Sequence, residues 1–157
     1  MKLYAPKRTI VESKKRISKV LVIADASSQA LVSVLDSLQT LQKDALSSIR
    51  VIFISILSET LMKNLGPNVI ALLLREERET LAKAKEYFDR MNKPYDIKVI
   101  IAPPWKPVLN EIRDRDGDHD LIILQGEFLN LWREYTIIGC PYSQMMHSPK
   151  YSILTIN

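Results

Sequence analysis

The run Lys19-Val20-Leu21-Val22-Ile23-Ala24-Asp25 is the part of the sequence that decides the fold. Its middle is continuously apolar and lacks the alternation of a strand with one wet face, a pattern typical of a parallel strand buried on both faces. Ser27 or Ser28 is suited to cap a helix directly after it. The apolar residues that follow fall on one helical face: Leu31, Val34, Leu35, Leu38, Leu41 and Ala45.

The same order of an apolar run and a helix-like segment recurs along the chain. Four more strands are expected, at 51–57, 97–101, 121–124 and 152–156. Strands that alternate with helices favour a parallel sheet covered by helices. The sequence therefore predicts an α/β domain, in which a five-stranded parallel sheet forms the middle of three layers and helices lie on both faces.

Proline residues set the ends of the expected helices. The longest helix is expected to start at Gly66-Pro67 after a loop, because proline suits the first helical turn. Its apolar stripe is interrupted once, at Glu77-Arg78, and it ends at Asn92-Lys93-Pro94 because the residue before proline resists helical geometry. A short helix is expected at 108–115, after the proline-rich connection 103–107. A loop and a further short helix are expected before the last strand.

Charge is distributed unevenly along the chain. Residues 1–18 hold six basic residues and one acidic residue, a net charge of +5, whereas the whole chain of 157 residues carries +4. The remaining 139 residues therefore carry −1. We interpret residues 1–18 as a basic arm and residues 19–157 as one domain, since typical domains have about 100–200 residues.

Composition excludes several classes of protein. The apolar runs are far shorter than the roughly 20 residues that cross a bilayer, and a secretory signal is not recognisable, so a cytoplasmic protein without a membrane partner is expected. Cys140 is the only cysteine, and His119 and His147 stand far apart, so neither an internal disulfide nor a metal site is expected. A catalytic arrangement is not recognisable either.

Three segments resemble the universal stress protein family. Asp25-Ala26-Ser27 after the first strand resembles the family's Asp-Gly-Ser, and Asp120–Leu124 resembles its fourth strand. His147-Ser148-Pro149, shortly before the last strand, is similar to the family's closing His-Ala-Pro. The resemblance covers about residues 19–157. It implies the strand order 3-2-1-4-5 and a homodimer formed through the C-terminal strand.

The resemblance also implies a nucleotide site at the carboxyl ends of the first and fourth strands, where the strand order reverses. ATP-binding members carry the loop Gly-x2-Gly-x9-Gly-Ser/Thr. This chain has Gly126, Leu129, Gly139 and Cys140 at that spacing, so one glycine and the hydroxyl are replaced, and Glu127 adds a carboxylate that repels phosphate. We therefore expect ATP binding to be impaired or lost.

If a nucleotide such as ATP or another adenine nucleotide is bound, the resemblance assigns roles to particular residues. Asp25 and the backbone of Ile56 would hold the adenosine end, and Gly126, Gly139 and Cys140 would line the phosphates. An aspartate before a helix is equally an ordinary helix cap. Trp105 is either an anchor for a partner or, as we favour, a residue packed against the third helix.

Three functions remain as hypotheses. The first is a dimeric regulatory or stress-response protein that is not an enzyme and requires no cofactor. The second is an ATP-binding switch of the same family. The third is a binder of nucleic acid or an anionic surface through the arm, for which affinity would fall steeply with salt. We favour the first, because the basic charge belongs to the arm and not to the domain.

Overall fold

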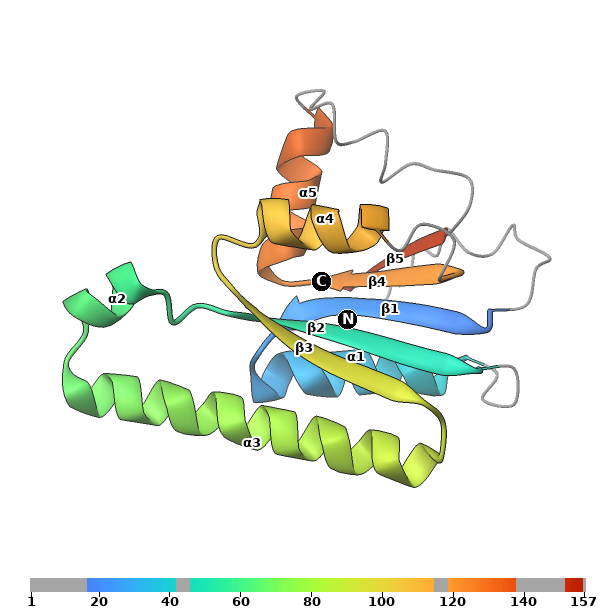
Figure 1. The fold of residues 1–157 in the computed structure, drawn as a ribbon, viewed down its shortest axis with the longest axis horizontal. Helices are drawn as coiled ribbons and strands as arrows, with labels where there is room; N and C mark the ends of the chain where they lie inside the picture. The colour runs from blue at the N-terminus through green and yellow to red at the C-terminus, as the bar shows by residue number, and fades with distance from the viewer. Residues whose placement is uncertain (1–16, 42–45, 115–118, 138–151, 157) are drawn as a thin grey trace.

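The computed structural model describes residues 17–41, 46–114, 119–137 and 152–156 (Figure 1). Within them lies one five-stranded sheet in the order β3-β2-β1-β4-β5, and every neighbouring pair is parallel. The strands are β1 (Lys19–Asp25), β2 (Ser48–Ser55), β3 (Tyr95–Ile101), β4 (Leu121–Gln125) and β5 (Ser152–Ile156). The predicted α/β fold and strand order are confirmed.

The central strand is β1. It pairs with β2 from Lys19↔Ser48 to Asp25↔Ile54, and with β4 from Val20↔Leu121 to Ile23↔Leu124. Residues 20–24 are each 2% exposed or less. The run is continuously apolar because helices cover both faces of the sheet, as expected.

Two layers of helices enclose the sheet, as Figure 1 shows. On one face lie α1 (Ser28–Gln39) and α3 (Pro67–Met91), and on the other lie α4 (Trp105–Asp114) and α5 (Glu127–Ile137). Each face has its own core: Val22, Phe53 and Phe88 belong to the first, and Ile23, Ile52 and Phe128 to the second. None of the described helices is long and apolar enough to cross a membrane.

The ends of α1 and α3 follow the expected rules. Ser27 caps α1, since its side chain accepts a hydrogen bond from the Ala30 amide at 3.2 Å. Pro67 is the first residue of α3, and Asn92 ends that helix in the left-handed conformation at φ 58°. Both termini of α3 are therefore where the sequence predicted them.

Several boundaries differ from the prediction, among them the end of β2 at Ser55 and not at residue 57, the start of β3 at Tyr95 and not at residue 97, and the end of α1 at Gln39, before Leu41 and Ala45. β2 begins at Ser48 and not at residue 51, because Arg50 lies within the strand and pairs across to Asp96. α4 begins at Trp105 and not at residue 108, since proline is tolerated in a first helical turn. The expected loop after β2 contains α2 (Glu59–Asn64), which Ser58 caps by accepting a hydrogen bond from the Leu61 amide at 3.1 Å.

Candidate functional site

Asp25 ends β1 at the carboxyl edge of the sheet, beside the end of β4. Its backbone N–H donates to Oε1 of Gln125 at 3.0 Å, and its Oδ1 accepts from the backbone N–H of Glu127 at 3.0 Å. Glu127 is the first residue of α5. Asp25 therefore caps a helix, as one of the two interpretations held, but the helix is α5 and not the one that follows Asp25 in sequence.

Gly126 lies directly against this carboxylate. Its φ is +80°, a conformation that residues with a side chain rarely adopt. A Cβ added there would lie 2.4 Å from the carboxyl carbon of Asp25. Gly126 thus joins Asp25 in one place, as expected, and its lack of a side chain lets the carboxylate reach the start of α5.

Most of the segment expected to form a phosphate loop is helical. Residues 127–137 form α5, and Leu129 is 2% exposed within the second core. The ring of Phe128 stacks on Trp105 with their centroids 5.3 Å apart. Trp105 therefore packs against the second core, as favoured, but it is itself the first residue of α4, and its ring stacks on α5. Gly139 and Cys140 lie outside the described residues.

A cavity of about 170 Å³ lies beside Asp25. Its lining comes from the end of β1, the end of β2 and the middle of α3: Asp25, Ala26, Ser27, Ile54, Ile56, Leu73, Glu76 and Glu77. Ile56 is 47% exposed and shares this cavity with Asp25, so the structure brings these two predicted residues together. Pockets that hold small ligands usually measure about 300–1,000 Å³, so the cavity is small for a nucleotide.

Glu76 and Glu77 are site residues that the sequence analysis did not identify. Oε2 of Glu77 accepts a hydrogen bond from the buried hydroxyl of Ser55 at 2.6 Å, and Oε2 of Glu76 accepts from the backbone N–H of Ser28 at 3.3 Å. Together with Asp25 they place three carboxylates around the cavity. The sequence did contain a signal for them, because the apolar stripe of this helix is interrupted at Glu77-Arg78.

The electrostatic character of the cavity follows from this lining. Its residues, all of them described, include three acids and no lysine, arginine or histidine. Two like charges about 4 Å apart repel by about 1 kcal/mol in water and about 4 kcal/mol at an effective dielectric constant of about 20. Such a cavity disfavours anions and suits neutral or cationic groups.

Comparison with known proteins shows which fold the chain has. No protein-family model matches the sequence, and neither does any curated protein. The chain is similar in structure to a protein of the universal stress protein family from Burkholderia pseudomallei, with a TM-score of 0.51 and 16% identity over 88% of this chain and 95% of that one. The sheet, its strand order and this likeness define the universal stress protein fold.

Two further structures give weaker matches. One is a universal stress protein family protein from Arabidopsis thaliana with AMP bound, with a TM-score of 0.49 and 11% identity over 88% of this chain and 90% of that one. The other is a universal stress protein in complex with cAMP, with a TM-score of 0.47 and 15% identity over 91% of this chain and 98% of that one.

Proposed function

We propose that this chain is a regulatory protein of the universal stress protein type that acts in the cytoplasm, does not catalyse a reaction, and does not use ATP. The observation that carries the proposal is the hydrogen bond from the Glu127 amide to Oδ1 of Asp25. A carboxylate of the chain itself holds the helix terminus at the end of β4, where the resemblance would seat phosphates.

Helix N-termini bind anions because their first amides lack partners within the helix and their dipole favours negative charge. In this chain one of those amides already has an anionic partner. A phosphate that approached the start of α5 would have to displace Asp25 and would lie near its charge and that of Glu127, which is exposed. Both effects oppose binding of a triphosphate.

The cavity supports the same conclusion. Its volume of about 170 Å³ lies below the usual range for ligand pockets, and its three carboxylates repel phosphate. This lining is compatible with adenosine, which has no phosphates, or with another neutral or cationic compound. A regulatory role that depends on partner proteins requires no such ligand.

The test is calorimetric titration of Mg-ATP into the full chain and into Asp25→Asn. Asparagine keeps an oxygen for the Glu127 amide but removes the charge, so its affinity for ATP should equal or exceed that of the wild-type chain. We expect no heat of binding for the wild-type chain at millimolar ATP. Asp36→Asn, an exposed acid on α1, is the matched control.

Tight binding of ATP to the wild-type chain that Asp25→Asn weakens would overturn the proposal, because Asp25 would then be a nucleotide ligand. Release of phosphate from ATP, lost in the same variant, would overturn its non-catalytic part. Adenosine is titrated in parallel. If adenosine binds and ATP does not, the phosphates prevent binding; if neither binds, the cavity does not accept the nucleoside either.

We further propose a homodimer through β5. Among the described strands, β5 pairs only with β4. Ser152 donates its N–H to the carbonyl of Asp120 at 2.9 Å, and because parallel strands alternate their partners, the N–H group of Thr155 points away from β4. β5 of a second copy can pair along this edge.

A further inference from the structure

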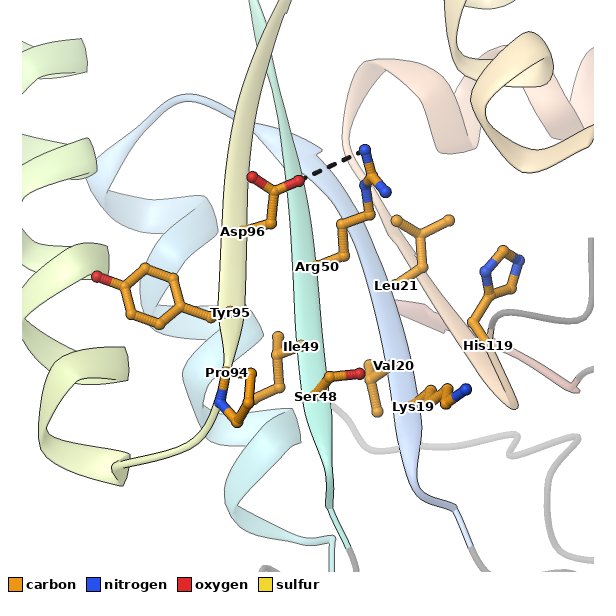
Figure 2. Close-up of a pocket in the computed structure, with 10 residues that line it drawn as sticks. All are labelled: Lys19, Val20, Leu21, Ser48, Ile49, Arg50, Pro94, Tyr95, Asp96 and His119. Carbon is orange, nitrogen blue, oxygen red and sulfur yellow. Dashed lines mark ion pairs between the residues drawn. The ribbon is translucent and has the colours of Figure 1, made fainter. Parts of the chain in front are cut away.

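A second and larger cavity lies at the opposite, amino end of the sheet (Figure 2). Its volume is about 390 Å³, within the range of about 300–1,000 Å³ that is usual for small-molecule sites. It is lined by the first residues of β1, β2 and β3 and by the residue before Asp120: Lys19, Val20, Leu21, Ser48, Ile49, Arg50, Pro94, Tyr95, Asp96 and His119.

Three side chains of this cavity stand on the same face of the sheet. Leu21, Arg50 and Asp96 are paired across three neighbouring strands, and Leu21 belongs to the second core, so they face α4 and α5. α4 has ten residues and is about 15 Å long, whereas the eight residues of β2 span about 26 Å. α4 therefore covers only part of this face.

Arg50 is held rigidly and still has a free donor. Its Nη2 makes both of its ion pairs, with Oδ2 of Asp96 at 3.4 Å and with Oε1 of Glu111 at 3.1 Å. Within the described parts of the chain, its Nη1 makes no hydrogen bond, and its Nε is buried without a hydrogen-bond partner. An arginine fixed by two carboxylates is preorganised, so a ligand on Nη1 would cost little side-chain entropy.

The side chains that line the cavity carry an excess of one cation, and the carboxylate of Asp120 stands beside them, since its Oδ2 accepts from the backbone N–H of Lys19 at 3.0 Å. Asp96 and Glu111 are balanced by Arg50 and by Lys98, which also pairs with Glu111. Lys19 is exposed and forms no ion pair with the described residues. The lining therefore carries one unbalanced positive charge.

The shape and lining define the class of ligand. Figure 2 shows the side chain of Leu21 between Arg50 and His119, with Lys19 at the lower end of the same strand. An apolar floor with charged donors around it suits a compound that has both an apolar body and an anionic group. The imidazole of His119, 4% exposed, closes one side.

We propose that this amino-end cavity binds a small organic anion, a carboxylate or a phosphate monoester with an apolar body, through Nη1 of Arg50 and the ammonium group of Lys19. The site lies at the opposite edge of the sheet from Asp25. Its occupation is therefore independent of the function proposed for the carboxyl-end cleft.

The experiment is a titration of the full chain, labelled with ¹⁵N, with phenyl phosphate, benzoate and the neutral compound phenol. We expect saturable shifts of the amide signals of Leu21 and Arg50 with at least one of the two anions and none with phenol. Tighter binding of phenyl phosphate or of benzoate shows whether the site prefers a phosphate or a carboxylate. Lys19→Gln removes a charged contact and should weaken binding by about tenfold or more.

Lys85→Gln is the matched control, because Lys85 is exposed on α3 and lies outside the cavity. Its affinity should equal that of the wild-type chain. Arg50→Gln should abolish binding, and if that variant fails to fold, Lys19→Gln still decides. Equal shifts with phenol, shifts that do not saturate, or equal weakening by Lys19→Gln and Lys85→Gln would overturn the proposal, as would no shift with either anion.

Discussion

Asp25 and Gly126 are far apart in sequence but form a close contact that leaves no room for a side chain at residue 126. A methyl group at residue 126 would meet the Asp25 carboxylate at 2.4 Å and would require φ of +80°. We predict that Gly126→Ala lowers the free energy of unfolding by about 2–4 kcal/mol, measured by urea denaturation.

Gly66→Ala is the control for that substitution, because nothing lies within 4 Å of a Cβ there and the φ is −70°. It should change stability by less than about 1 kcal/mol. In an Asp25→Ala background the clash is absent, so Gly126→Ala should cost clearly less than in the wild-type chain. Strict additivity of the two substitutions would contradict the contact.

Tyr95 offers a titration that reports on a single contact. Its hydroxyl donates to Oδ1 of Asp89 at 2.6 Å, and this hydrogen bond, then partial burial and the charge of Asp89, raise the pKa of Tyr95 above 10.0. Because the folded pKa is raised, the contribution to stability is present below pH 10.0 and is lost as the pH rises through the folded pKa.

We predict that Asp89→Ala moves the pKa of Tyr95 down toward 10.0, followed by NMR of ¹³C-labelled tyrosine. Glu86→Ala on the same helix is the control, since Glu86 pairs with Arg90 and not with Tyr95. An unchanged titration of Tyr95 in Asp89→Ala would show that the hydrogen bond is not the cause.

At the scale of elements, one polar contact joins the end of β2 to the middle of α3. The hydroxyl of Ser55 is buried and donates to Glu77 at 2.6 Å, and it also accepts from the Leu57 amide at 3.1 Å. We predict that Ser55→Ala destabilises the fold by about 1–3 kcal/mol, measured by thermal and urea unfolding.

A double-mutant cycle with Glu77→Gln isolates the contact from other effects of each substitution. The coupling between Ser55 and Glu77 should be favourable, whereas Glu79→Gln, an exposed acid on the same helix, should show none. Zero coupling for the first pair would mean that the helix is held by its apolar residues alone.

The elements also show how far the sequence could be interpreted. Strands and the ends of α3 were predictable, because continuous apolar runs, Pro67 and Asn92 act locally. α5 was not predicted where it lies, because the partner that caps it, Asp25, is about a hundred residues away in sequence. Glu76 and Glu77 were missed for the same reason: Glu77 interrupts the apolar stripe of a helix, and only the fold shows that Ser55 faces it.

For the whole molecule, we expect the edge of β5 that faces away from β4 to determine the oligomeric state. Thr155→Pro removes an N–H group that points away from β4, and proline is tolerated on edge strands. We predict that the wild-type chain is a dimer and that Thr155→Pro is a folded monomer, measured by size exclusion with light scattering and by circular dichroism. A monomeric wild-type chain, or a dimeric variant, would contradict pairing through β5.

The central place of β1 has a consequence for synthesis. One partner, β2, begins 23 residues after the end of β1 at Asp25, but Leu121 follows its partner Val20 by 101 residues. At about 5–20 residues per second, the ribosome needs about 5–20 s to make that interval. During that time one side of an almost wholly apolar strand is open to other nascent chains, so we expect the yield of native protein to depend on translation speed and on a chaperone that holds this strand.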